Sequence, residues 1–193
     1  MPVAYLLGEA WFAGLRFRVD PSVLIPRSPV AELIATRCEP WIDGRKPRRI
    51  LDLCCGSGCI GIAAALAWPD AEVVLSDISP AALALARENV ALHGVGERVR
   101  VVESDLFAAL GGEIFDLILS NPPYVDAADM DALPAEFRHE PRLGLAAGED
   151  GLDIARRLLG EAPAHLEPEG LLVLEVGNRA DALGPAFPQL PFL

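Results

Sequence analysis

The sequence lacks any run of 18 consecutive apolar residues, although 52% of its 193 residues are hydrophobic. A membrane-spanning helix is therefore not expected. The first residues contain no basic region followed by a long apolar run, so no secretory signal is expected. Cysteine is scarce: the four present have no zinc-ribbon spacing, and no second pair or nearby histidine completes a metal site. We expect reduced thiols, a cytoplasmic protein and no bound metal.

Positive charge is also in short supply, because 16 Lys and Arg residues stand against 28 Asp and Glu residues and leave a net charge of −12. An acidic surface repels phosphate backbones, so we expect no direct, sequence-specific binding of nucleic acid. The same charge favours a cationic partner, although solubility alone accounts for it equally well. The length fits one domain with a single core.

The chain divides into an N-terminal hairpin and a longer alternating region. Apolar and polar residues alternate around Gly14, which predicts a β-hairpin with a glycine turn, and residues 1–26 are interpreted as this hairpin and a connector. Ser28, followed by a proline, is suited to open a helix that we expect to extend to about Trp41. The region 27–193 is interpreted as one cofactor-binding domain.

From residue 49 onward, short apolar runs alternate with helical patterns. The runs are continuous, which is typical of strands buried on both faces. Such units favour right-handed crossovers and an α/β, Rossmann-like fold: a mostly parallel twisted sheet with helices on both faces. The segment 125–150 is too long for a plain connector and is interpreted as a lid or a substrate-binding segment. The expected strands are 50–53, 72–77, 99–105, 116–120 and 170–176, and the expected helices are 62–68, 81–93 (capped by Ser79) and 152–166.

A glycine-rich turn between the first of these strands and its helix indicates a nucleotide-containing ligand. Residues 56–61 (Gly-Ser-Gly-Cys-Ile-Gly) match the dinucleotide-binding fingerprint. Asp77 follows at the end of the next strand, where it could accept hydrogen bonds from ribose hydroxyls. An NAD-dependent oxidoreductase is therefore one candidate.

Two further carboxylates favour a different ligand. Asp52 lies just before the glycines, where a carboxylate would repel a pyrophosphate but could bind an ammonium group. Asp105, at the end of the third strand, is placed to accept from an adenine amino group, with the apolar Leu106 beside the ring. A ligand with ammonium, ribose and adenine groups but no phosphate is S-adenosylmethionine.

A second motif, Asn121-Pro122-Pro123-Tyr124, follows the apolar run of the fourth strand. Prolines hold φ at about −65° and donate no hydrogen bond, so their carbonyls are free to face a ligand. Asn121 and the Pro122 carbonyl could each accept one hydrogen of a planar NH2 group, and the Tyr124 ring could cover its face. We expect Asn121, Pro122 and Tyr124 to be catalytic, and all four residues to bind substrate, by orienting that nitrogen.

With these residues in place, the chain resembles the S-adenosylmethionine-dependent protein N5-glutamine methyltransferases (HemK-like), which modify release factors and ribosomal proteins. Three flanking segments are most similar to the branch that acts on the third protein of the large ribosomal subunit, namely 9–14, 26–29 and 137–141. The shared marks of the family are the turn from Asp52 to Gly61, Asp77, Asp105 and the motif from Asn121 to Tyr124.

The resemblance implies a class I methyltransferase fold and methyl transfer to a glutamine side-chain amide of that ribosomal protein, with S-adenosylhomocysteine as product. The chain departs from the family pattern in lacking a helical domain before the hairpin and a final strand pair, and in having Cys55 where Thr or Gly is expected. The cofactor-binding residues that the resemblance implies are Asp52, Leu53, Cys54, Cys55, Gly56, Gly58, Asp77, Ile78, Asp105, Leu106 and Asn121.

Other functions stay open on the sequence alone. A release-factor glutamine methyltransferase shares the chemistry. A nucleic-acid adenine-amine methyltransferase also uses an Asn-Pro-Pro-Tyr segment, but it needs base flipping and a basic surface. The oxidoreductase rests on the glycine turn, and a fragment that binds cofactor without catalysing transfer is a further reading. His139 is a candidate general base, but we favour the interpretation that His139 and Glu140 only shape their loop.

Overall fold

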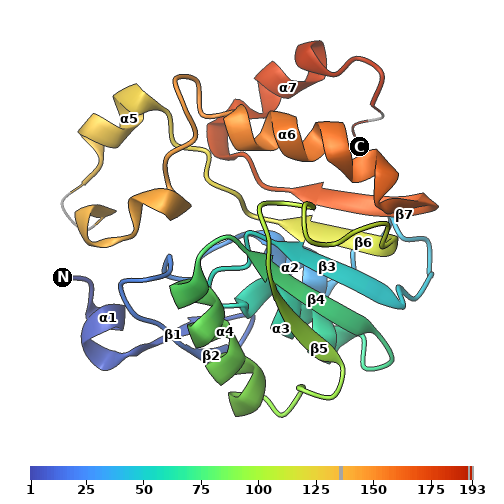
Figure 1. Cartoon of the computed structure of the whole chain (residues 1–193), viewed down its shortest axis with the longest axis horizontal. Coiled ribbons are helices and arrows are strands. Elements are labelled where there is room, and N and C mark those ends of the chain that lie inside the picture. Colours follow the sequence, from blue (N-terminus) through green and yellow to red (C-terminus); the bar gives the residue numbers. More distant parts are fainter. Residues whose placement is uncertain (135–136, 191, 193) are drawn as a thin grey trace.

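A five-stranded sheet forms the centre of the computed structural model, which describes residues 1–134, 137–190 and 192. Its strands are β3 (Arg49–Leu53), β4 (Glu72–Asp77), β5 (Val99–Glu103), β6 (Phe115–Ser120) and β7 (Leu166–Leu174). All are parallel, in the order β5-β4-β3-β6-β7 (Figure 1), so the predicted parallel α/β fold is confirmed. The chain builds outward from β3 to β5 and then returns to add β6 and β7 on the other side.

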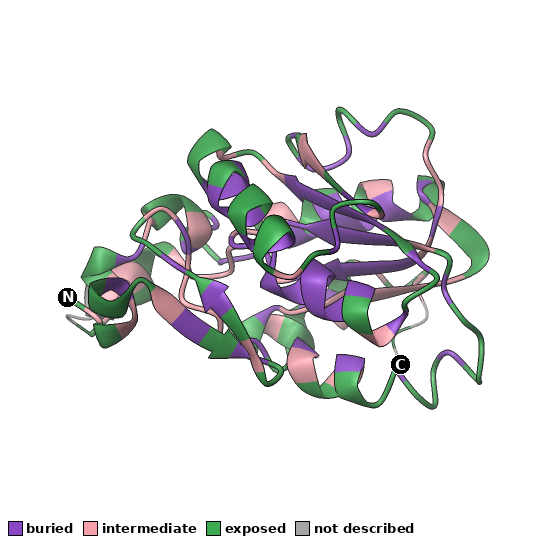
Figure 2. Ribbon diagram, turned by 90° about the horizontal axis from the view of Figure 1, so that it is seen from below, coloured by how far each residue is buried: buried purple, intermediate pink, exposed green. Residues whose placement is uncertain are grey.

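Helices cover both faces of the sheet, as predicted (Figures 1 and 2). One face packs against α2 (Val30–Ala35), α3 (Cys59–Ala67) and α4 (Pro80–Leu92). The other packs against the segment 104–114, α6 (Asp153–Glu161) and α7 (Ala180–Ala186). None of the described helices is long and apolar enough to cross a membrane.

Neighbouring residues of each strand supply the two cores. Ile50 and Leu51 are both fully buried, but Ile50 belongs to the core under α3, whereas Leu51 belongs to the core under α6. Successive side chains of a strand point to opposite faces, so a strand covered on both sides must be apolar throughout. This explains the continuous apolar runs in the sequence.

The predicted hairpin is confirmed, with β1 (Glu9–Phe12) and β2 (Leu15–Arg18) joined by a two-residue turn at Ala13 and Gly14. A short helix, α1 (Val3–Leu7), precedes it and was not predicted, because five residues are too few to show a helical period.

Several predicted boundaries were wrong. The helix after Ser28 ends at Ala35 instead of Trp41, because the Thr36 hydroxyl donates back to helix carbonyls and the next two residues have positive φ. The helix predicted to start at Ile62 begins three residues earlier. By contrast, the start of α4 is confirmed, since the Ser79 hydroxyl accepts from the Ala82 N–H at 3.3 Å.

The C-terminal boundaries also differ from the prediction. The helix expected over 152–166 ends at Glu161 and passes into a 3₁₀ turn at Ala162–Ala164, where Pro163 cannot donate a helical hydrogen bond. The last strand therefore starts at Leu166 instead of Gly170.

The segment 125–150 has structure of its own. It contains α5 (Ala127–Ala132), capped by Asp126, and two 3₁₀ turns at Phe137–His139 and Arg142–Gly144. Residues 135–136 of this segment, and residues 191 and 193 of the predicted domain, lie outside the described residues. Figure 1 shows α5 at the same end of the molecule as α1.

Candidate functional site

The candidate site lies where β3 and β6 end side by side, at the point where the strand order reverses. Open α/β sheets bind ligands at this edge, beyond the carboxyl ends of their strands. Leu53 pairs with Ser120 across the two strands, and the Ser120 hydroxyl donates a 2.9 Å hydrogen bond to the Leu53 carbonyl. The glycine-rich turn after β3 is thereby fixed beside the segment Asn121–Tyr124 after β6. The two predicted motifs meet at one edge of the sheet.

The glycine-rich turn has a left-handed backbone at several positions. Gly56 and Gly58 have φ of 52° and 78°, which glycine adopts without strain, but Cys54 also has φ of 57°. Leu106, after β5 on the same edge, has φ of 48°. Non-glycine residues in this region are strained and concentrate at ligand sites. Two of the predicted cofactor-binding residues, Cys54 and Leu106, carry this feature.

Asp52 is fully buried within β3, under the start of α3. Its Oδ2 accepts a 2.7 Å hydrogen bond from the Gly61 N–H, whereas Oδ1 has no partner among the described residues. Glycine is needed at position 61, since a Cβ there would lie 2.2 Å from a methyl carbon of Leu75. Burial, assisted by the charge of Asp77, raises the pKa of Asp52 from 3.8 to about 8 against the effect of the Gly61 bond. A buried acceptor without a partner suits an incoming cationic donor.

Asp77, at the end of β4, ties that strand to the glycine turn. Its Oδ2 accepts from the Gly56 N–H and its Oδ1 from the Ser79 N–H, both at 2.9 Å. Burial raises the pKa of this carboxyl group, and the backbone donors oppose the rise. A carboxylate oxygen has two lone pairs, so each oxygen can still accept a second hydrogen bond from a ligand. The neighbouring Ile78 is 50% exposed and presents an apolar surface beside it.

Asp105 is the most exposed of the three predicted strand-end acids. Arg157 of α6 forms an ion pair with it at 3.0 Å, with both side chains about half exposed. The following Leu106 is buried. The carboxylate predicted to accept from adenine is thus held by an arginine that the sequence did not indicate, and solvent weakens this pair.

Three thiols surround the glycine turn, namely Cys54, Cys55 and Cys59. Burial raises the pKa of Cys54 and of Cys59 to about 12, and raises that of Cys55 well above its usual value. They are therefore protonated at neutral pH and serve as small packing residues instead of nucleophiles. In the described part of the chain, no three His, Cys, Asp or Glu side chains are grouped to hold a metal ion.

The segment Asn121–Tyr124 leaves β6 at the site. Pro122 is buried, and the other three residues are half-buried. The Tyr124 hydroxyl donates to Glu175 Oε1 at 3.1 Å. Over residues 1–134, 137–190 and 192, no protein group is hydrogen-bonded to the Asn121 carboxamide or to the Pro122 carbonyl. These groups are free to bind a ligand.

An arginine joins the segment 125–150 to the site. Arg27 pairs with the buried Glu140 at 2.5 Å, and its guanidinium lies 4.5 Å from the centre of the Phe137 ring. The Ile25 N–H is 3.4 Å from the same carboxylate. Glu140 thus anchors its loop, whereas His139 is exposed.

Three residues that organise this edge, Asn89, Arg157 and Glu175, were not among the predicted site residues, and Ser28 was predicted only to open a helix, of which Pro29 is the N-cap. Glu175 follows β7 directly, so the rule that selected the other strand-end acids could have found it. Ser28 donates to Glu175 Oε2 at 2.5 Å. Asn89 bonds the backbone of Arg18 and the Ser57 carbonyl, and no local pattern indicates those contacts.

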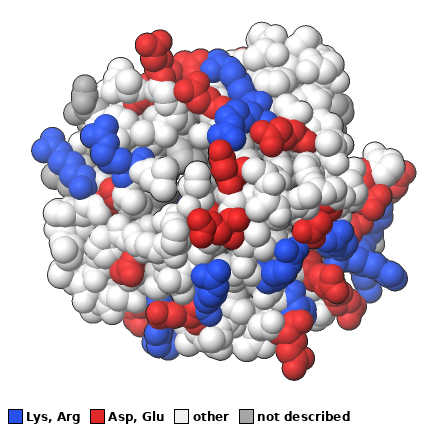
Figure 3. Space-filling view, in the orientation of Figure 1, with Lys and Arg blue, Asp and Glu red and all other residues white. Residues whose placement is uncertain are grey.

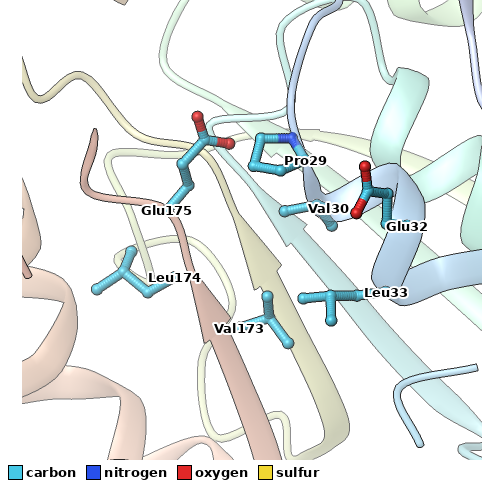
Figure 4. A pocket seen from close by; sticks show the side chains of 7 residues that line it. All are labelled: Pro29, Val30, Glu32, Leu33, Val173, Leu174 and Glu175. Carbon is cyan, nitrogen blue, oxygen red and sulfur yellow. The ribbon is translucent and has the colours of Figure 1, made fainter. Parts of the chain in front are cut away.

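A hollow of about 300 Å³ lies between α2 and β7 (Figure 4). Its lining is mostly apolar, with Glu32 and Glu175 as the charged groups. None of its lining residues belongs to the glycine turn. Figure 3 shows acidic and basic side chains interspersed on the viewed face, without a basic patch.

Comparison with known proteins places these features in context. The family model described as "Methyltransferase small domain" matches residues 39–140. A protein of Francisella tularensis subsp. tularensis named ribosomal protein uL3 glutamine methyltransferase is 50% identical over 192 residues, which is 99% of this chain and 61% of that protein. A protein of Xylella fastidiosa with the same name is 52% identical, over 100% of this chain and 61% of its own length. The chain thus spans about three fifths of these relatives.

Among solved structures, a ribosomal protein L11 methylase from Lactobacillus delbrueckii subsp. bulgaricus has a similar fold. Its TM-score is 0.60 at 23% sequence identity, over 90% of this chain and 74% of the other. At this identity the likeness concerns the fold, which is that of class I methyltransferases.

Proposed function

Because the chain belongs to the methyltransferase small-domain family, we propose that it transfers a methyl group from S-adenosylmethionine to the side-chain amide nitrogen of a glutamine. As substrate we propose a large-subunit ribosomal protein of the uL3 type, after the names of relatives that are 50–52% identical to this chain over the aligned residues. The observation that carries the proposal is the segment Asn121–Tyr124, which lies beside the glycine turn with free acceptor groups.

The residues at the strand ends fit S-adenosylmethionine. The unpartnered Asp52 Oδ1 suits its ammonium group, and the remaining lone pairs of Asp77 suit the ribose hydroxyls. Asp105 would accept a hydrogen bond from the adenine amino group, and Leu106 would contact the adenine ring. The proposed set is completed by Leu53, Cys54, Cys55, Gly56, Gly58, Ile78 and Asn121. When bound, this cofactor supplies a methyl group on a positively charged sulfur.

The chain's own contribution to the reaction is orientation. A glutamine amide nitrogen is a weak nucleophile, because its lone pair is delocalised into the carbonyl group. Asn121 Oδ1 and the Pro122 carbonyl would accept its two hydrogens and aim the nitrogen, with Pro123 stiffening the segment and Tyr124 covering the amide plane. Such positioning lowers a barrier by several kcal/mol without a strong base.

The charge of the chain agrees with a ribosomal protein as partner. Ribosomal proteins contact RNA and are commonly basic, whereas this chain has a net charge of −12. Opposite charges accelerate association, and the effect falls with added salt. The same charge disfavours DNA as a substrate.

Methyl transfer from labelled S-adenosylmethionine tests the proposal on three substrates: uL3 in undermethylated large subunits, release factor, and DNA. We expect label on a glutamine of uL3. Label on release factor alone would retain the chemistry and change the substrate, and label on DNA alone would contradict the proposal.

Asn121→Ala tests the role of the carboxamide. We expect turnover to fall by about a hundredfold or more, while the Kd of S-adenosylhomocysteine changes by less than about threefold. Asn121→Asp is the matched variant, since it retains the acceptor but adds a charge. Unchanged turnover in Asn121→Ala would exclude this role.

A further inference from the structure

Glu175 connects three segments that are far apart in the sequence. It directly follows β7, and its N–H donates to the Ser120 carbonyl at 3.0 Å, which holds it beside the end of β6. Its Oε1 accepts from the Tyr124 hydroxyl at 3.1 Å, and its Oε2 accepts from the Ser28 hydroxyl at 2.5 Å. One carboxylate thus joins β7, the segment after β6 and the start of α2.

The Tyr124 ring is confined at a second place. Gly177 lies against the ring edge, because a Cβ there would be 2.9 Å from Cε2 and 3.0 Å from Cδ2. A larger residue at position 177 would push the ring away. The hydroxyl bond and this close approach together allow the ring little rotation.

Ser28 in turn has a defined orientation. Its hydroxyl oxygen accepts from the Val30 N–H at 3.2 Å while donating to Glu175, and the side chain is buried. The preceding Arg27 binds Glu140 of the segment 125–150. The consecutive residues Arg27 and Ser28 therefore bind two carboxylates: Arg27 binds Glu140 of the segment 125–150, and Ser28 binds Glu175, which also bonds Tyr124.

We propose that Glu175 is a positioning residue, which fixes the Tyr124 ring at the angle needed to cover the amide plane of the substrate. This inference rests on the proposed glutamine methyl transfer. Tyr124 is only half-buried, so without the hydroxyl bond its ring would populate other rotamers. Small displacements of a positioning group cost large factors in rate.

The electrostatics agree with this arrangement. Burial and the Glu175 carboxylate raise the pKa of Tyr124 to about 12, against a small opposing effect of Arg27. The hydroxyl therefore stays protonated at neutral pH and donates to Glu175 instead of acting as a base.

A spectroscopic experiment reads this contact directly, because the chain contains only two tyrosines. The protein is labelled with 3-fluorotyrosine, and the two ¹⁹F signals are followed against pH, with Tyr124 assigned by its loss in Tyr124→Phe. In Glu175→Gln we expect the pKa of Tyr124 to fall by about one unit, because the neighbouring charge is gone. Tyr5, which donates to the Val23 carbonyl, is the internal control and should titrate as before.

A kinetic cycle then tests the consequence for transfer. Glu175→Gln should lower kcat by about tenfold and leave the Kd of S-adenosylhomocysteine within about twofold. The double variant with Tyr124→Phe should lose less kcat than the two single variants would lose independently, because both substitutions break the same hydrogen bond between Tyr124 and Glu175. Glu32→Gln is the matched control, since Glu32 lines the same hollow from α2 (Figure 4), and its kcat should be unchanged.

The outcomes separate this inference from the proposed function. An unchanged Tyr124 titration in Glu175→Gln, or fully additive losses of kcat, would overturn the positioning role. If the wild-type chain labels none of the three substrates, the glutamine proposal fails. The ¹⁹F titration still decides in that case whether Glu175 holds the ring.

Discussion

Replacing Asp52 by asparagine tests whether the buried carboxyl group of Asp52 is largely protonated in the ligand-free folded chain. Burial raises its pKa from 3.8 to about 8 in the folded chain. The folded state therefore retains this proton at pH values where the unfolded state has lost it. Its contribution to stability is fully present below about pH 4 and is lost as the pH rises through about 8.

The size of this effect follows from the two pKa values. They differ by about four units, and each unit corresponds to about 1.4 kcal/mol, so the free energy of unfolding should fall by roughly 5 kcal/mol between pH 4 and pH 8. A carboxamide cannot ionise, but its NH2 group would lack an acceptor and cost about 1–3 kcal/mol. At pH 8, Asp52→Asn should therefore be more stable than the wild type by about 2–4 kcal/mol.

Urea unfolding of the ligand-free protein at pH 5, 6, 7 and 8 measures this difference. The difference between variant and wild type should grow steadily with pH. Asp77→Asn is the comparison variant: burial also raises the pKa of Asp77, but two backbone donors oppose the rise, so its difference from the wild type should grow less with pH. A constant difference across the four pH values would refute the reasoning.

The same variant tests what Asp52 binds. An ammonium group beside the carboxylate would favour ionisation, so S-adenosylhomocysteine should release up to about one proton on binding at pH 6.5. 5′-Methylthioadenosine, which lacks the amino acid portion, should release none. Asp52→Asn should weaken S-adenosylhomocysteine by about tenfold or more and leave 5′-methylthioadenosine unchanged. Calorimetry in two buffers of different ionisation enthalpy measures both quantities.

Two further variants address the contacts that the sequence did not reveal. Arg157→Gln removes the ion pair that holds Asp105. Because a half-exposed ion pair is weak, the affinity for adenosine ligands should rise by at most about fivefold. Calorimetry measures this affinity, and a loss would contradict competition between Arg157 and the ligand for Asp105. Asn89→Ala leaves buried backbone groups of Arg18 and Ser57 without partners and should lower the free energy of unfolding by about 2–4 kcal/mol. Urea unfolding measures this loss, and a change below about 1 kcal/mol would show that water replaces the side chain.

The sheet and its ligand edge were predictable because their signals are local. Continuous apolar runs identify strands buried on both faces, and Ser79 followed by proline marks a helix start. Parallel strands end at one edge, so the sequence predicts Asp52, Asp77 and Asp105 at the same edge. In the structure Asp52 lies in β3 and Asp77 ends β4, whereas Asp105 lies two residues beyond the end of β5 at Glu103, so the strand predicted over 99–105 is shorter than expected.

The contacts that orient the site were not predictable, because they join residues far apart in the chain. Ser28 and Glu175 are separated by 147 positions, and Arg18 and Asn89 by 71. Nothing in the local pattern around an isolated serine or asparagine indicates such a partner. Short elements such as α1 and α5 escaped for a related reason, since five or six residues show no reliable period.

The three strand-end acids also differ in a way that only the structure reveals. Asp52 is fully buried on the central strand β3, Asp77 is partly buried on β4, and Asp105 is exposed beyond the outer strand β5. The ammonium group of a ligand would need a carboxylate partner at the buried end of the site, because a buried charge is costly unless it is paired. Among the described residues, Asp52 is the acid with an unpartnered oxygen at that depth. An uncharged base can lie at the rim, where solvent already satisfies its polar atoms. This order from inside to outside supports the proposed ligand, with its ammonium end at β3 and its adenine at β5, whereas a dinucleotide would place its pyrophosphate beside the Asp52 carboxyl group.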